Sequence, residues 1–349
     1  MDFERKKYSF ENKEPCVIIA EVGVNHNGDP EIAQKMVDVA VKARANIVKF
    51  QLFKSEKEIS KYAPKAPYQS MTTSPDENQL EMCKSLELDI TSIQRMKRYC
   101  SKKGIGFLCT AFESDSADKL ANILKLKTVK IPSGEITNLP FLEYIGLLFD
   151  SVVLSTGAST IAETQSAIQA INKGGCTDIL LLHCVTSYPA DVGDVNLRVM
   201  KTMEDALGYR VGFSDHTQGI TVAMGAVALG AAAIEKHFTL DRSLPGPDHR
   251  ASIEPDELCA MVKGIREIES ALGSPIKKPQ PCELPNLHLV RKGLVASRDL
   301  KKGETLREEM IEIKRPEMGI SPGDFHRILG MKLTREVKDD APIRWEDLK

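Results

Sequence analysis

Eight short runs of β-branched and aliphatic residues recur along the chain, with helical patterns between them. A strand that is buried on both faces reads as a continuous apolar run, and a (β/α)₈ barrel requires eight such strands alternating with helices. The number of runs carries this inference more than any single run does. We therefore predict an α/β fold, a TIM barrel, with these strands: Cys16 to Val22, Asn46 to Gln51, Ile105 to Thr110, Thr128 to Ser133, Ser151 to Thr156, Asp178 to Cys184, Val211 to Asp215 and Ala231 to Phe238.

The segments between these runs have the apolar spacing of amphipathic helices. Pro30 to Ala43 shows this spacing, and Pro255 to Leu272 carries a proline near its first turn, as helices often do. Three further segments fit the same pattern: Asp115 to Leu126, Thr160 to Lys173 and Gly219 to Leu229.

Two other segments depart from this alternation. The insertion Leu52 to Asp89 follows the second strand, and barrel enzymes place their active sites at the carboxyl ends of the strands, so we expect a lid or substrate loop there. Residues 277–286 are rich in proline and read as a linker. The chain of 349 residues then divides into a barrel over 1–276 and a small, loop-rich second domain over 287–349.

The composition excludes several classes of protein. Lys and Arg total 47 against 49 Asp and Glu, and aromatic residues are only 5%, so neither a nucleic-acid partner nor a charged membrane surface is indicated. Eight cysteines occur without a C-x-x-C pair, which is typical of reduced thiols in the cytoplasm. The first 15 residues lack the apolar core of a secretory signal, and the apolar run Ile220 to Ile234 is shorter than the roughly 18 residues of a membrane span. We expect a cytoplasmic protein.

Polar residues two positions apart occur at the ends of three predicted strands. Residues i and i+2 share one face of a strand, so each pair should point into the barrel. A charge left unpaired there costs several kcal/mol, and Glu21, Lys49, Lys130 and Glu235 must therefore have partners, ligands or both. The three pairs are Lys49 and Gln51, Ser214 and His216, and Glu235 and His237.

The predicted strand ends bring together groups that suit a phosphorylated, acidic ligand. Two ammonium groups and several hydroxyls would line one mouth. His216 and His237, on strands seven and eight, would project into the same mouth and could share a divalent ion, although a single histidine at a strand end is as often structural. The ammonium and hydroxyl groups belong to Lys49, Thr110, Lys130, Ser133, Ser155 and Ser214.

Nine stretches of the chain match a known family in order: IIAEVGVNHNGD (18–29), VKFQ (48–51), KIPSGEITNLP (130–140), LSTGAST (154–160), LLHCVTSYPA (181–190), GFSDHTQGI (212–220), ALGAAAIEKHFTLD (228–241), GPDHRASIEPDEL (246–258) and IKRPEMGISP (313–322). In these stretches nearly the whole chain resembles the sialic acid synthases, which condense phosphoenolpyruvate with an N-acetylated mannose-type sugar to make nonulosonic acids. The last sixty residues resemble the antifreeze-like (SAF) domain of that family.

The resemblance implies a role for each matching residue. The six residues with ammonium and hydroxyl groups would hold phosphoenolpyruvate, and His216 and His237 would bind a divalent ion, usually Mn²⁺, with Mg²⁺ or Co²⁺ as alternatives. Arg315 would reach the N-acetyl group of the sugar in the barrel of a partner subunit, in a domain-exchanged homodimer. The remaining implied residues are Glu21, Gln51 and Glu135 near the reacting atoms, and Tyr188 and Asp248 at the sugar.

The identity of the sugar differs between branches of this family. Thr186 stands where the N-acetylneuraminate enzymes carry asparagine, while Ala66 to Gln69 and Asn78 to Leu88 are similar to the legionaminic-acid branch. That branch takes a 2,4-diacetamido-6-deoxy hexose, whereas the other takes N-acetylmannosamine. Either N-acetylneuraminate or N,N'-diacetyllegionaminate is therefore a possible product, formed with cleavage of the C–O bond of phosphoenolpyruvate and release of phosphate.

Three other functions remain open from the residues alone. Lys49 or Lys130 could form a Schiff base in a pyruvate aldolase. A heptulosonate-phosphate synthase would use phosphoenolpyruvate and a metal, but with a phosphorylated aldose. A non-catalytic carbohydrate- or ice-binding protein would have no need of the charged set at the barrel mouth. We interpret Asn25, His26 and Asn27 as residues that shape a loop.

Overall fold

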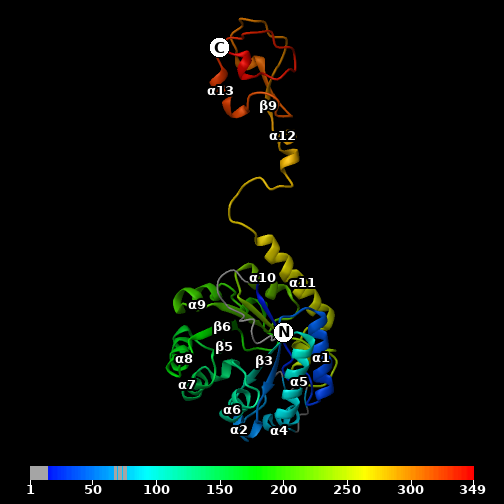
Figure 1. Cartoon of the computed structure of the whole chain (residues 1–349), viewed down its shortest axis with the longest axis vertical. Coiled ribbons are helices and arrows are strands. Elements are labelled where there is room, and N and C mark those ends of the chain that lie inside the picture. Colours follow the sequence, from blue (N-terminus) through cyan, green and yellow to red (C-terminus); the bar gives the residue numbers. More distant parts are fainter. Residues whose placement is uncertain (1–14, 67–68, 70–72, 74–76) are drawn as a thin grey trace. The chain divides into compact units, whose positions relative to one another are not determined.

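The computed structural model describes residues 15–66, 69, 73 and 77–349, and the chain folds into two compact units (Figure 1). The first unit ends at Gly273 and the second runs from Ser274 to Lys349. Residues 1–14, for which we predicted that there is no secretory signal, lie outside the described residues. Pro67 and Tyr68, from the stretch 66–69, also lie outside them. The boundaries at 276 and 286 stay predictions.

The first unit is the predicted TIM barrel. Its eight strands pair in sequence order, all in parallel, and β8 closes on β1. Each observed strand overlaps the run that predicted it. The strands are β1 (Val17–Glu21), β2 (Ile47–Leu52), β3 (Gly106–Ala111), β4 (Thr128–Ile131), β5 (Ser151–Ser155), β6 (Asp178–Cys184), β7 (Val211–Asp215) and β8 (Ala233–His237).

Helices cover the outside of this barrel (Figure 1). Local signals start several of them: the Asp29 side chain accepts a hydrogen bond from the Glu31 amide ahead of α1, and Thr160 and Glu163 form a capping box at α8. The helices are α1 (Pro30–Lys42), α5 (Ile90–Lys103), α6 (Ser114–Asn122), α7 (Leu139–Leu148), α8 (Ile161–Lys173), α9 (Val199–Leu207), α10 (Thr221–Ala228) and α11 (Pro255–Leu272).

The barrel has two apolar layers because its strands alternate their side chains. One layer, with Ile19, Leu108 and Leu180, forms its own cluster. The other layer packs the opposite faces of the strands against the helices and includes Ile18 and Phe50. Strand pairing then aligns the polar residues, because Glu21 is opposite both Lys49 and His237, and Thr110 is opposite Lys130.

The described residues of the insertion after β2 include two short helices, α2 (Ser55–Glu58) and α4 (Gln79–Ser85). The carboxylate of Glu87, after α4, ties this segment to the start of α2, accepting hydrogen bonds from the Ser55 amide at 2.9 Å and from Lys54 Nζ at 2.7 Å. The loop after β1 has the shaping role we expected for Asn25, whose amide nitrogen donates to the Phe238 carbonyl and to Ser252 Oγ.

The second unit has a small apolar core of its own, which includes Leu294, Leu306 and Ile343. Its sheet has two antiparallel strands, β9 (Gly293–Ala296) and β10 (Ile311–Lys314), and its short helices include α12 (Leu287–Val290) and α13 (Phe325–Ile328). Most of its chain lies in loops and turns, as predicted. Among the described residues, no helix has the length and apolarity needed to cross a membrane.

Candidate active site

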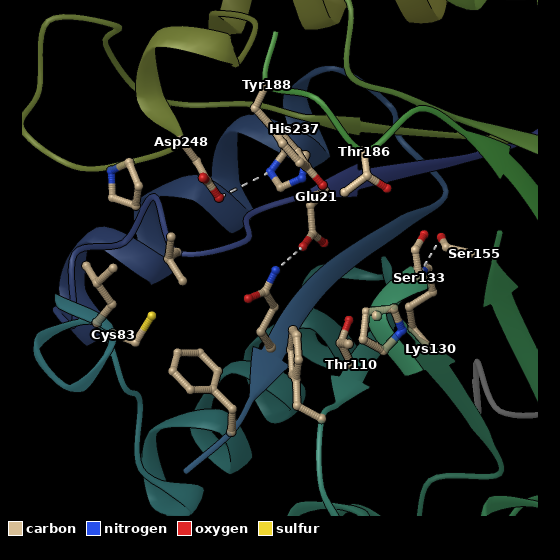
Figure 2. Close-up of a pocket in the computed structure, with 18 of the residues that line it drawn as sticks. Glu21, Cys83, Thr110, Lys130, Ser133, Ser155, Thr186, Tyr188, His237 and Asp248 are labelled. Carbon is tan, nitrogen blue, oxygen red and sulfur yellow. Dashed lines mark hydrogen bonds and ion pairs between the residues drawn. The ribbon is translucent and has the colours of Figure 1, made fainter. Parts of the chain in front are cut away.

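A pocket of about 260 Å³ opens at the carboxyl ends of the barrel strands, where TIM-barrel enzymes carry their active sites (Figure 2). Every strand except β6 supplies a residue that the sequence singled out, and the loops after β6 and β8 add two more. The predicted residues that line the pocket are Glu21, Lys49, Gln51, Thr110, Lys130, Ser133, Ser155, Tyr188, Ser214, His216, His237 and Asp248.

Two predicted residues do not line this pocket. Glu135 lies in an adjoining pocket that shares Glu58 and Phe112 with the first, and its carboxylate accepts a hydrogen bond from the Asn138 amide at 2.7 Å. Arg315 belongs to the second unit, where it is exposed directly after β10. The barrel therefore brings together all the predicted residues except these two.

A buried ion-pair network forms the floor of the pocket. Lys49 Nζ lies 3.2 Å from Glu21 Oε2 and 3.2 Å from Glu235 Oε2, and all three side chains are almost fully buried. Burial lowers the pKa of Lys49, but the two carboxylates outweigh it and the pKa is raised. Lys49 is thus held as an ammonium ion, which explains how its charge is tolerated among apolar strands.

Glu21 differs from Glu235 in its electrostatics, although both pair with Lys49. Burial raises the pKa of Glu21 to about 7, despite the nearby Lys49 and the hydrogen bond that Gln51 Nε2 donates at 2.9 Å. For Glu235 burial acts in the same direction, but Lys49 and Lys130 outweigh it and lower the pKa. Glu21 can therefore take up or release a proton near neutral pH, while Glu235 stays ionised.

Lys130 supplies the second cation at the opposite side of the pocket from Cys83 (Figure 2). Its Nζ donates to Ser155 Oγ at 2.6 Å and to the Ile131 carbonyl at 2.9 Å, and burial lowers its pKa to about 8. Ser133 Oγ accepts from the Gly157 amide at 2.8 Å. With Lys49 Nζ 3.3 Å from Thr110 Oγ1, these groups form a cationic, hydroxyl-rich side that suits an anion.

His216 and His237 face each other with ring centroids 5.7 Å apart. The hydrogen bond between His216 Nδ1 and the Val185 carbonyl, 2.7 Å long, fixes the tautomer in which Nε2 carries the lone pair, and Nε2 lies 3.4 Å from Ser214 Oγ. His237 Nδ1 is buried and has no hydrogen-bond partner, 3.8 Å from Asp248 Oδ2. Burial lowers the pKa of both rings, and the neutral form is the one that binds metals.

These two imidazoles fit a divalent ion that keeps several open positions. Within the described parts of the chain, no group of three or more His, Cys, Asp or Glu side chains could hold a metal. Water or substrate oxygens would have to complete the coordination of an ion bound at His216 and His237.

Tyr188 and Asp248 complete the wall around the histidines (Figure 2). The Tyr188 ring packs against His216, with centroids 4.1 Å apart, and meets His237 edge-on at 5.8 Å. Burial raises the pKa of Asp248 to about 6. A sugar that reaches the histidines would therefore touch both a phenol and a carboxyl group.

Sequence reasoning missed the apolar part of the pocket. Among the apolar side chains that line the pocket, five form one hydrophobic cluster, and two of these are phenylalanines placed directly after strands β2 and β3. The position of these aromatic residues, next to polar strand ends, is the signal that could have revealed them. The five residues are Val24, Phe53, Cys83, Leu86 and Phe112, which we call the apolar wall.

Comparisons with known proteins agree with this geometry. The NeuB family matches residues 36–277 and the SAF domain matches residues 291–349. The N,N'-diacetyllegionaminic acid synthase of Campylobacter jejuni is 48% identical over 330 residues, covering 94% of this chain and 98% of the relative, and that of Legionella pneumophila is 41% identical, covering 96% and 95%. A crystal structure of N-acetylneuraminic acid synthetase from Leptospira borgpetersenii, in complex with citrate, superposes with a TM-score of 0.68 at 34% identity, covering 78% of this chain and 90% of that one.

Proposed function

The chain belongs to the NeuB family, and we propose from this premise that it condenses phosphoenolpyruvate with an N-acetylated mannose-type sugar. It is a nonulosonic acid synthase, a transferase that releases phosphate. The observation that carries the proposal is a pocket with Lys49 and Lys130 at one side and two facing histidines beside them. A phosphorylated enol and an aldehyde need this juxtaposition to react.

Phosphoenolpyruvate would bind at the cationic side. Lys130 and the hydroxyls of Ser155 and Ser133 would hold its anionic groups, together with Lys49, Thr110 and Ser214. The charges of the two lysines cancel those of Glu21 and Glu235, so the hydrogen-bond donors of the cationic side, not a net charge, would hold the anion.

Condensation forms a bond between C3 of phosphoenolpyruvate and the aldehyde carbon of the open-chain sugar. Water then adds to C2, and the resulting tetrahedral carbon expels phosphate by cleavage of its C–O bond. His216 and His237 would hold a divalent ion, Mn²⁺ by our proposal, which when bound would supply Lewis-acid polarisation of the aldehyde. Gln51 would hold Glu21 in place, and Glu21 would accept the proton of the attacking water. Glu135, which the resemblance places near the reacting atoms, lines the adjoining pocket and stays an alternative for proton transfer.

For the sugar, we propose the 2,4-diacetamido-6-deoxy hexose, which gives N,N'-diacetyllegionaminate. Two relatives named as synthases of that product are 48% and 41% identical to this chain, against 34% for the N-acetylneuraminic acid synthetase. Thr186, which lines the pocket, supports the same branch. Tyr188 and Asp248 would contact the sugar.

The assembly and location are part of the same proposal. Arg315 would contact the N-acetyl group of a sugar held in the barrel of a partner subunit, which requires a domain-exchanged homodimer. We further propose that the enzyme works in the cytoplasm, where its eight free cysteines stay reduced.

Phosphate release tests the proposal directly. The purified enzyme is supplied with Mn²⁺ and phosphoenolpyruvate that carries ¹⁸O in the bridging oxygen, together with the diacetamido sugar or with N-acetylmannosamine. We expect faster turnover of the diacetamido sugar and recovery of the label in phosphate. Label retained in the sugar acid would contradict C–O cleavage.

The rival aldolase gives the opposite pattern. Borohydride would trap pyruvate on Lys49 or Lys130, and activity would survive removal of metal with EDTA. Faster turnover of a phosphorylated aldose would favour a heptulosonate-phosphate synthase, and ice binding without any phosphate release would favour a non-catalytic binder.

A further inference from the structure

The apolar wall stands apart from the rest of the barrel interior. Its five residues form a hydrophobic cluster of their own, separate from the core between strands and helices. All five also line the active-site pocket. A cluster that belongs to no core and faces a ligand cavity is available for contact with a ligand.

Three structural elements build this wall. Phe53 directly follows β2 and Phe112 directly follows β3, and their rings meet at 72° with centroids 5.7 Å apart. Cys83 lies in α4 and Leu86 caps its C-terminus, so the insertion after β2 supplies another part of the wall, and Val24 packs in the same cluster. The edge-to-face ring pair holds a stiff apolar surface.

The part of the apolar wall that the insertion after β2 supplies, with Cys83, lies across the pocket from Lys130. Figure 2 shows Cys83 at one side, Lys130, Ser133 and Ser155 at the other, and Glu21 between them. If the anionic groups of phosphoenolpyruvate bind at Lys130, its C3 and the aldehyde meet near Glu21 and the histidines. The end of the sugar remote from the aldehyde must then extend to the apolar wall.

The chemistry of the wall selects the substituents at that remote end. A hydroxyl pressed against Phe53 and Phe112 would lose its hydrogen bonds to water, whereas a methyl group would gain from leaving water. We infer that the apolar wall determines specificity by packing against methyl groups of a 6-deoxy, N-acylated hexose. This inference rests on the proposed function and adds the residues that choose between the two candidate sugars.

The test compares Phe112→Ala with the matched control Phe107→Ala. Both phenylalanines are half-buried, both come from the β3 segment and both contact one other aromatic ring, but Phe107 stacks on Phe50 at 5.8 Å, away from the pocket. For each variant, kcat/KM is measured with the diacetamido sugar and with N-acetylmannosamine, and KM is measured for phosphoenolpyruvate. We expect Phe112→Ala to reduce the preference for the diacetamido sugar by about 10- to 200-fold, with the KM of phosphoenolpyruvate unchanged.

A second variant guards against a folding defect. Cys83→Ser keeps the size of the side chain and adds polarity to the wall, and we expect it to reduce the same preference without a change in circular dichroism. The same preference ratio in Phe112→Ala, Cys83→Ser and Phe107→Ala would overturn the role of the wall while leaving the proposed function intact. Failure of the unaltered enzyme to release phosphate with either sugar would instead overturn the proposed function, and the inference with it.

Discussion

Two buried lysines, Lys49 on β2 and Lys236 on β8, show how carboxylate partners hold a charge inside this barrel. Lys49 points into the pocket, between Glu21 and Glu235. Lys236 points out of it and is fully buried, with its Nζ 2.9 Å from Asp215 Oδ2. Breaking a buried pair of this kind costs about 3–5 kcal/mol. Asp215 on β7 and Lys236 on β8 directly precede the two histidines. Their ion pair therefore also holds together the ends of β7 and β8 next to those histidines.

His26 should make the stability of the barrel depend on pH. Its ring is 1% exposed, its Nδ1 accepts a hydrogen bond from the Gly28 amide at 3.0 Å, and burial lowers its pKa to about 4. The unfolded chain, with a pKa near 6.5, binds a proton first as pH falls, so acidification favours unfolding. We expect His26 to remove about 2 kcal/mol from the free energy of unfolding between pH 7 and pH 5.

Urea unfolding of the unaltered protein and of His26→Asn at both pH values measures this contribution. Asparagine can still accept the Gly28 hydrogen bond but does not titrate. The other buried histidines contribute to both proteins, so the difference between them isolates His26. Equal losses of stability in the two proteins would show that His26 does not titrate in this range.

At the scale of elements, sequence patterns predict strands better than they predict contacts. All eight strands are recognisable because strands buried on both faces are continuously apolar. Helix α7 does not show the amphipathic pattern, because its apolar residues occur on all sides. One of them, Leu147, is exposed. The period-two rule found the polar side of the pocket. It could not find the apolar wall, because Phe53, Cys83 and Phe112 come from separate segments that meet only after α4 packs at the barrel mouth.

Helices α7 and α8 approach each other closely at Gly146. A methyl group there would overlap the Ile171 carbonyl oxygen and lie 3.0 Å from Gly174 Cα, and neither neighbour can move without shifting backbone. We expect Gly146→Ala to lower the free energy of unfolding by about 1–3 kcal/mol, as overpacking does. Gly225→Ala in α10 is the control, since its methyl would lie 3.5 Å from Leu197 Cδ1 in ordinary contact. That variant should gain about 0.5–1 kcal/mol. Equal effects in urea unfolding would refute the argument from packing.

At the scale of the whole molecule, we propose different roles for the two units. The barrel holds the complete cationic side, the two histidines and the apolar wall. The second unit carries the exposed Arg315 and has its own core, and its first residues, 274–286, are exposed. A domain with a separate core and an exposed connection can be exchanged between subunits without loss of its fold. Our proposal that Arg315 serves the barrel of a partner therefore concerns the assembly and can be tested on the assembly.

Mixed dimers distinguish two arrangements. In one, the second domain completes the site of the partner subunit; in the other, it completes the site of its own barrel. One subunit carries His237→Ala and the other Arg315→Ala, and the two are co-expressed with different tags and purified through both. If the domains are exchanged, one site of each mixed dimer combines an unaltered barrel with an unaltered second domain, so we expect about half the activity of the unaltered dimer. If each domain serves its own barrel, both sites carry a defect. The mixed dimer would then be no more active than the Arg315→Ala dimer, and the KM of the sugar would stay at the value of that variant.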